Sequence, residues 1–355
     1  MSDRERQEAL HRASATFKAL RASRTFARDR NLFGTRSRWL LGRQYEYLWP
    51  FATTWSALCT LGSLPGNRRA IDLAKGMLEG LAAYSREPQI LEARDEAGFE
   101  SVVTPPVGSG GDRYFDDNAW LGLALVRLYE LTGALELLSL AERIFTFVVS
   151  GWSTDTTWHL PGGIRWKEPS TNHSRNTCAN GPACALAARL YEKTARGDYL
   201  EWATRIYSWT RRALLGSDAL YFDRVAPDGT PSATIWSYNQ GTMIGAGVLL
   251  ARITQTRSFL DESAATATAY VNGRSVTDLM TQDPAFNAVF FRNVLLLDQE
   301  QPDTRYRDLM SSYASAMWQT KRMRHGFFAG NGSLLNNTAA MVQTYALVAG
   351  AQAHA

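Results

Sequence analysis

The chain repeats a two-helix unit along most of its length, and this repeat limits the possible folds more than any other feature. In each unit a segment that is apolar on nearly all sides is followed by a short break and an amphipathic segment. The clearest unit runs from Asp116 to Ser150, where NAWLGLALVRLYELTG carries only the charges of Arg127 and Glu130. A helix that is apolar all round is expected to be buried, whereas a single apolar stripe covers a core from one side. Gly133 at the break is a predicted left-handed helix cap.

The alternation predicts six inner and six outer helices. These are the numbers of helices in an all-α, (α/α)6 barrel. An open helical solenoid is the alternative, but it favours shorter, uniform repeats with polar capping helices. The loops before the inner helices are long, and no linker divides the chain, so residues 1–355 are predicted to form one domain. The predicted helices are 5–29, 46–61, 68–84, the pair within 116–150, 183–192, 198–215, 240–253, 258–271, 283–297, 303–318 and 334–349.

The composition excludes several function classes. The net charge is +4, and the Lys and Arg residues are scattered, with their densest cluster interleaved with apolar residues near the N-terminus. A nucleic-acid-binding protein would gather them on one stripe, so no nucleic-acid partner is expected. No run approaches ~18 apolar residues, which predicts no membrane span. The first twenty residues are charged throughout and lack the apolar core of a signal peptide, which predicts a cytoplasmic location.

The three cysteines, Cys59, Cys178 and Cys184, are an odd number and show neither disulfide nor zinc spacing. Free or buried thiols are therefore expected. No HExxH motif and no EF-hand spacing occurs, so we expect no metal and no cofactor. Nothing in the sequence indicates an oligomeric state.

The segment Tyr114-Phe115-Asp116-Asp117-Asn118 places two adjacent carboxylates at the start of a buried helix. One Asp there would be explained by helix capping. Two carboxylates in one cleft repel each other, so one is expected to stay protonated near neutral pH and to act as an acid. Consecutive Cα atoms lie ~3.8 Å apart, which suits the ~5–5.5 Å carboxyl separation of retaining glycosidases better than the wider inverting separation.

A second candidate segment spans residues 160–183. Gly162 and Gly163 predict a tight turn that leads into Trp166. Asn180 is interpreted as a helix cap before Pro182, and we also include it among the candidate substrate-binding residues.

A third segment spans residues 219–241 and contains Asp223, Tyr238, Asn239 and Gln240. Aromatic rings can cover the apolar face of a sugar, and amides can bond its hydroxyl groups. Helix caps and loop packing explain each of these residues singly about as well.

The motifs YFDDNAW, GGIRW, ANGPACALAARLYEKT and SYNQGTMIGAGVLL occur in this order. From about residue 15 onwards the chain resembles glycoside hydrolase family 76, the endo-α-1,6-mannanases. The resemblance implies an (α/α)6 barrel and retaining hydrolysis of α-1,6-mannan or α-mannooligosaccharides without a metal. It also implies that Asp116 is the nucleophile and Asp117 the general acid/base. The residues that it places in the mannose subsites are Trp166, Asp223, Tyr238, Asn239 and Gln240.

Three other functions are alternatives for a helical barrel. A sugar 2-epimerase would need histidines at the barrel mouth, and none of the five histidines falls on a predicted inner helix. A non-catalytic carbohydrate-binding barrel would be indicated by loss of an aspartate, and both are present. Isoprenoid chemistry would need a DDxxD-like cluster, whereas Asn118, Ala119 and Trp120 follow the aspartates.

Overall fold

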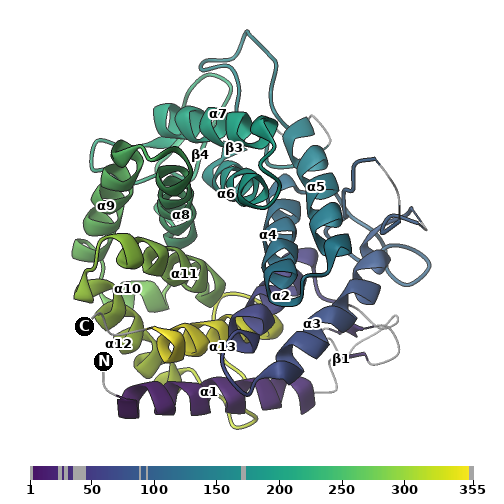
Figure 1. The fold of residues 1–355 in the computed structure, drawn as a ribbon, viewed down its shortest axis with the longest axis vertical. Helices are drawn as coiled ribbons and strands as arrows, with labels where there is room; N and C mark the ends of the chain where they lie inside the picture. Colours follow the sequence, from purple (N-terminus) through teal and green to yellow (C-terminus); the bar gives the residue numbers. More distant parts are fainter. Residues whose placement is uncertain are drawn as a thin grey trace.

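Two concentric rings of helices make up the protein (Figure 1). The computed structural model describes residues 3–22, 26–27, 31–34, 45–87, 89–92, 95–168 and 173–351. The inner ring consists of α2 (Leu48–Gly62), α4 (Phe115–Thr132), α6 (Thr177–Thr194), α8 (Ser237–Thr254), α11 (Pro284–Glu300) and α13 (Leu334–Gly350). The outer ring consists of α1 (Asp3–Ala22), α3 (Arg68–Leu81), α5 (Leu135–Ser150), α7 (Gly197–Leu214), α9 (Arg257–Asn272) and α12 (Thr304–Thr320).

The inner ring is closed. Each inner helix packs against the next one along the chain, and α13 packs against α2, while α1 covers α13 from outside. The predicted (α/α)6 barrel is therefore confirmed, and the open solenoid is wrong. Because an outer helix returns the chain after each inner one, the inner helices run in the same direction. Their N-terminal ends meet at one mouth of the barrel and their C-terminal ends at the other.

The alternation of buried and half-buried helices explains this architecture. Inner helices such as α6 and α13 are buried on nearly all sides, whereas α3 and α7 bury a stripe and expose the rest. Gly241 allows α8 and α11 to approach closely, since a Cβ atom there would lie 2.5 Å from the Cα of Phe290. Gly133 ends α4 with a φ of 72°, as predicted from its position.

Two predicted helix boundaries are wrong by more than three residues. Helix α6 begins at Thr177 rather than at residue 183, so Pro182 lies inside it. The missing amide of Pro182 removes only the bond to the carbonyl of Cys178, and packing from all sides keeps this segment helical. Helix α1 ends at Ala22 rather than at residue 29, and residues 23–25 and 28–30 lie outside the described residues.

Short elements in the loops were not predicted. They are the helix α10 (Val276–Met280), the 3-10 turn η1 (Ala82–Tyr84), the antiparallel pair β1 (Phe26–Ala27) and β2 (Leu32–Phe33), and the antiparallel sheet β3 (Arg175–Asn176), β4 (Arg224–Val225) and β5 (Pro231–Ser232). The three-stranded sheet ties the loop before α6 to the loop before α8. These loops form a common rim over the N-terminal ends of the inner helices.

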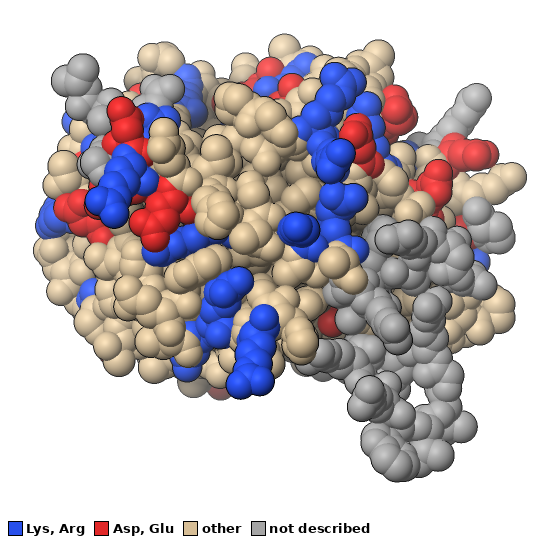
Figure 2. Space-filling view, turned by 90° about the horizontal axis from the view of Figure 1, so that it is seen from below, with Lys and Arg blue, Asp and Glu red and all other residues tan. Residues whose placement is uncertain are grey.

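The helices in the part of the chain that the structure describes bear on the predicted absence of a membrane span. None of these helices is long and apolar enough to cross a bilayer. On the face drawn in Figure 2, the Lys and Arg side chains lie among acidic and uncharged ones.

Candidate active site

Asp116 and Asp117 lie in the first turn of α4, at the rim of the barrel. The N-cap residue of α4 is Tyr114, and its side chain makes no capping hydrogen bond, so capping by an N-cap aspartate, the alternative explanation, does not apply. The backbone amide of Asp117 donates to Oδ1 of Asp116 at 3.0 Å. Both aspartates remain partly accessible to solvent, which leaves them within reach of a substrate.

Two side chains from the next rim loop and helix hold the Asp116 carboxylate. The Nε1 of Trp166 donates to Oδ2 at 3.0 Å, and the Sγ of Cys178 donates to the same oxygen at 3.3 Å. The ring of Tyr114 packs edge-on against Trp166, with 4.9 Å between the ring centroids. Burial raises the pKa of Asp116 to about 6, while the hydrogen bonds from Cys178, Trp166 and the backbone oppose this rise.

Asp117 has no such partners. Its side chain makes no hydrogen bond within the described part of the chain. Burial raises its pKa well above the ordinary value, and the negative charge of Asp116 raises it further. The two carboxyl groups therefore differ: hydrogen bonds stabilise the ionised form of Asp116, whereas burial and the neighbouring charge favour the protonated form of Asp117. One acid and one nucleophile or base side by side is the pair that glycoside hydrolysis requires.

Three more of the predicted residues lie beside this pair. Burial raises the pKa of the Cys178 thiol, the charges of Asp116 and Asp223 raise it further, and a hydrogen bond with Tyr238 lowers it. Tyr238 and Asp223 therefore lie close to Cys178, which itself contacts Asp116. The ring of Tyr238 stacks on Phe286, with 3.9 Å between the centroids. Asn239 lies near Asp223 and lowers its pKa, which burial raises, but neither amide atom of Asn239 reaches standard hydrogen-bond geometry. A buried amide without partners at a rim is a candidate for contact with sugar hydroxyl groups.

The other two predicted residues, Asn180 and Gln240, hold backbone instead of facing the aspartates. Asn180 accepts from the amide of Ile164 at 2.8 Å and donates to its carbonyl at 2.9 Å. Gln240 accepts from the amide of Tyr221 at 2.8 Å and donates to its carbonyl at 2.8 Å. Both side chains are fully buried. Asn180 is therefore not the predicted helix cap, because it lies one turn inside α6 and hydrogen-bonds the backbone of the rim loop.

Hydrogen bonds from a side-chain amide to the backbone recur around the barrel at the fourth residue of an inner helix. In α4, Asn118 bonds both backbone groups of Phe99, and in α13, Asn337 bonds both backbone groups of Gly332. In α11, Asn287 donates to the carbonyl of the rim loop at 2.8 Å. The sequence carries the signal as FDDN, TCAN, SYNQ, PAFN and LLNN, each with an amide in fourth place. The shared function of these amides is to hold the rim loops against the helix ends.

The same alignment identifies a site residue that the sequence analysis missed. In the second place of α4, α6 and α8 stand Asp116, Cys178 and Tyr238, and the structure brings these three side chains together. Cys178 was interpreted only as a free or buried thiol. Comparing the helix starts with one another, instead of searching for cysteine motifs, would have placed it in the site.

Two further carboxylates at the same mouth were also missed. Glu46 precedes α2 and is buried, and burial raises its pKa. Asp283 caps α11 by accepting from the amide of Ala285 at 2.8 Å, and burial raises its pKa as well.

Among the described residues, no group of three His, Cys, Asp or Glu side chains is arranged to hold a metal ion. No described histidine contacts Asp116 or Asp117, which disfavours the epimerase interpretation.

Known proteins resemble the chain along nearly its whole length. The model of the family described as Glycosyl hydrolase family 76 matches residues 26–352. A putative mannan endo-1,6-alpha-mannosidase of Schizosaccharomyces pombe is 30% identical over 217 residues, which are 57% of this chain and 45% of the relative. A mannan endo-1,6-alpha-mannosidase of Candida glabrata is 26% identical over 241 residues, 59% of this chain and 52% of the relative. The matches thus span about half the length of these curated relatives.

Solved structures share the fold. A family 76 glycoside hydrolase from a bovine Bacteroides thetaiotaomicron strain superposes with a TM-score of 0.80 at 21% identity, over 96% of this chain and 77% of the other. The α-1,6-mannanase of a Salegentibacter species gives a TM-score of 0.76 at 22% identity, over 97% and 99% of the two chains. The motif order, the closed barrel and the match over 26–352 agree, and the chain belongs to glycosyl hydrolase family 76.

Proposed function

We propose that the protein hydrolyses α-1,6-mannosidic linkages with retention of configuration. The observation that carries this proposal is the different surroundings of two adjacent carboxyl groups: Asp116 accepts hydrogen bonds from Trp166 and Cys178, whereas burial and the charge of Asp116 raise the pKa of Asp117. The mannan endo-1,6-alpha-mannosidases among the relatives support the choice of linkage. A Salegentibacter α-1,6-mannanase variant with two adjacent Asp residues replaced by Asn is described as inactive and in complex with α-1,6-mannotriose.

In the first step, an oxygen of Asp116 attacks the anomeric carbon of a mannose unit, and the bond to the leaving oxygen breaks. Asp117 donates its proton to that oxygen, which leaves as a hydroxyl group. In the second step, the ionised Asp117 takes a proton from water, and the resulting hydroxyl attacks the anomeric carbon and releases Asp116. Two inversions give net retention. Trp166 and Cys178 fix the carboxylate through Oδ2, which pre-orients the nucleophile.

The remaining residues fall into two groups in this proposal. Trp166, Tyr238, Asp223 and Asn239 line the mannose subsites, because rings cover the apolar face of a sugar and polar groups bond its hydroxyls. Asn180, Gln240 and the other fourth-place amides act as positioning residues that hold the rim. The carboxyl separation typical of retaining enzymes and the cytoplasmic location stay predictions from the sequence.

Product analysis tests the proposed linkage. The protein is incubated with α-1,6-linked mannooligosaccharides and, separately, with α-1,2- and α-1,3-linked isomers, and products are identified by mass and chromatography. We expect cleavage of the α-1,6 set and its loss in Asp116→Asn. Cleavage of another isomer in preference would overturn the linkage assignment. No cleavage together with calorimetric binding would favour a carbohydrate-binding role.

A plot of the rate of hydrolysis against pH is expected to be bell-shaped. The nucleophile must be ionised, so activity rises with pH through the pKa of Asp116, about 6. The acid must be protonated, so activity falls again as pH passes the raised pKa of Asp117. The measurement is kcat/KM for an α-1,6-mannooligosaccharide between pH 4 and 9. Full activity near pH 4, where Asp116 is protonated, would contradict the assignment.

Replacing Cys178 by Ala is expected to shift the acidic limb of this pH–rate profile to higher pH. The thiol stabilises the ionised form of Asp116, so its removal raises the pKa of the nucleophile. A hydrogen bond to a charged group contributes enough to move the limb by roughly 0.5–1 pH unit. Cys178→Ser keeps a donor and is the matched control, expected to move the limb less. An identical profile in Cys178→Ala and the wild type would show that the thiol does not tune Asp116.

A further inference from the structure

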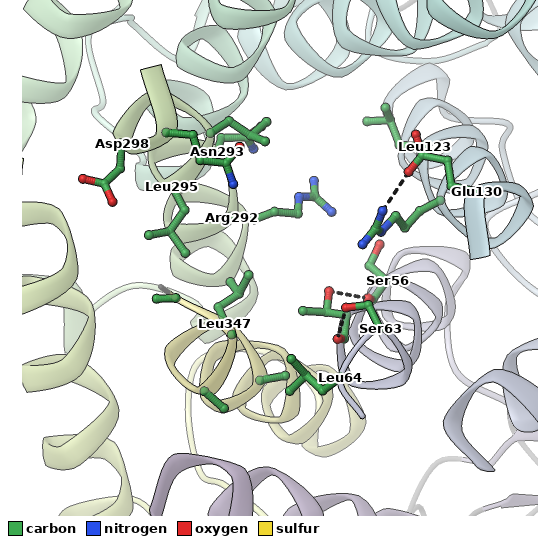
Figure 3. Close-up of a pocket in the computed structure, with 18 of the residues that line it drawn as sticks. Ser56, Ser63, Leu64, Leu123, Glu130, Arg292, Asn293, Leu295, Asp298 and Leu347 are labelled. Carbon is green, nitrogen blue, oxygen red and sulfur yellow. Dashed lines mark hydrogen bonds and ion pairs between the residues drawn. The ribbon is translucent and has the colours of Figure 1, made fainter. Parts of the chain in front are cut away.

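A second cavity, of about 1180 Å³, lies at the mouth of the barrel opposite to the aspartates (Figure 3). The C-terminal parts of the inner helices surround it. Helix α4 shows the separation: Asp116 stands in its first turn, whereas Arg127 and Glu130 near its end line the cavity. Eleven residues at 1.5 Å each place Arg127 about 16 Å from Asp116 along the helix. The lining also reaches Trp120 of α4 and Thr242 of α8, one turn beyond Asp116 and Tyr238, but the arginines of the cavity lie at its end away from the aspartates.

Arg292 of α11 projects into this cavity. Figure 3 shows its guanidinium reaching from α11 towards the centre of the ring. Within the described chain it makes no hydrogen bond and no ion pair. Burial, together with the positive charges of Arg189 and Arg127, lowers its pKa to about 10. It still carries its charge at neutral pH. Arg127 and Arg189 line the same cavity and act on its pKa, and no carboxylate is among the groups that do so.

Each carboxylate that lines the cavity is paired with a cation other than Arg292 or lies at the edge of the cavity. Glu130 pairs with Arg127 at 2.8 Å and with Lys193 at 2.8 Å. Asp298 pairs with Arg307 at 3.2 Å and points away from Arg292 in Figure 3. Asp3, the remaining acidic residue of the lining, is exposed at the start of α1. The centre of the cavity is thus electropositive.

Arg292 is half-buried, so it keeps only part of its hydration, and a group of opposite charge would stabilise it. The planar fork of an arginine matches the oxygens of phosphate, and several arginines around one point are a common way to hold that group. Ser56 and Thr60 of α2 and Asn293 of α11 also line the cavity and supply neutral polar groups.

We propose that this cavity binds a phosphate group, free or carried by a small organic molecule, between Arg292, Arg127 and Arg189. Arg127 and Arg189 each use one nitrogen, at 2.8 and 2.9 Å, to pair with a glutamate, which leaves other donors for a ligand. The apolar part of the lining leaves room for an organic body, and it includes Leu64, Leu123, Leu295 and Leu347. The site is independent of mannoside hydrolysis.

Thermal unfolding with inorganic phosphate as the probe tests this site. A ligand that binds only the folded state raises Tm as its concentration exceeds Kd. We expect millimolar phosphate to raise the Tm of the wild type by more than about 2 °C relative to sodium chloride at equal ionic strength. A hexose 6-phosphate is run in parallel. A larger rise with the hexose phosphate indicates an organic ligand, and equal rises indicate free phosphate.

Arg292→Met and Arg292→Lys make the test specific. Met fills similar space without charge, so the phosphate response should vanish and the apparent affinity in calorimetry should fall at least tenfold. Lys keeps the charge but loses the fork and should keep a reduced response. Because Met also removes an unpaired charge, its Tm without phosphate should equal or exceed that of the wild type. Equal responses to phosphate and chloride in the wild type, or an undiminished phosphate response in Arg292→Met, would overturn the proposal.

Discussion

Asp116→Asn is expected to lower kcat for α-1,6-mannooligosaccharides by at least about a thousandfold, which corresponds to ~4 kcal/mol of transition-state stabilisation. The amide cannot form the covalent intermediate that the carboxylate forms. It also loses the negative charge that stabilises the developing positive charge on the sugar ring. The measurement is kcat by product release, with the thermal transition recorded on the same samples.

Asp117→Asn is the companion variant, with an expected loss of about 10²–10⁴ in kcat, the usual range for a general acid. A mannoside with a strongly acidic phenol as leaving group separates the two roles, because that leaving group departs without a proton. The first step should recover in Asp117→Asn and stay slow in Asp116→Asn. Recovery in Asp116→Asn alone would exchange the two assignments.

Neither asparagine variant should lose stability at neutral pH. In the folded protein both pKa values are raised above the unfolded value. Ionisation of the folded state is therefore unfavourable, and stability is lost as pH rises from the unfolded pKa through the folded one. Asparagine removes this loss, so Tm at pH 7 should equal or exceed that of the wild type. A lower Tm in both variants would mean that the loss of activity reports unfolding.

Arg175→Met is expected to lower the free energy of unfolding by about 3–5 kcal/mol. Arg175 is fully buried in β3, and its guanidinium donates to four carbonyl oxygens of the rim loops. It also lies over the rings of Trp158 and Trp209, at 4.9 and 5.2 Å from their centroids. Methionine would leave the four carbonyl groups without these donors, and no hydration is available at a fully buried position.

Denaturant unfolding and thermal scans check this expectation. Arg212→Met, an exposed arginine of α7, is the matched control and should stay within about 0.5 kcal/mol of the wild type. Arg175→Lys, with three donors and no planar fork, should fall between the two. Equal stability of Arg175→Met and Arg212→Met would show that the rim does not depend on this arginine.

The ring of helices could be predicted from the sequence because its signal is local. The segment 118–133 is apolar on nearly all sides, whereas its neighbour 135–150 carries a single apolar stripe. This difference distinguishes an inner helix from an outer helix without any tertiary information. The adjacent aspartates were equally local. The start of α6 could not be predicted from local signals. By short-range rules Pro182 and Asn180 indicate a helix boundary, but packing within the barrel overrides these rules.

The surroundings of the aspartates depend on contacts between distant segments. The bond from Trp166 to Asp116 joins residues 50 apart, and the strands β3, β4 and β5 have two residues each, too few for a periodic pattern. Asn180 and Gln240 looked like sugar-binding amides because their composition matches that use. Only their burial and their bonds to Ile164 and Tyr221 show that they hold the rim. Arg292 gave no sequence signal, since its importance lies in the absence of a partner.

The most direct test of the proposed chemistry is the anomeric configuration of the first product. Proton NMR follows the wild type acting on α-1,6-mannotetraose, with Asp116→Asn as the control, within the first minutes and before mutarotation. The α-anomer should appear first, because two displacements at the anomeric carbon restore the configuration. Initial release of the β-anomer would mean a single displacement by water and would contradict Asp116 as the nucleophile.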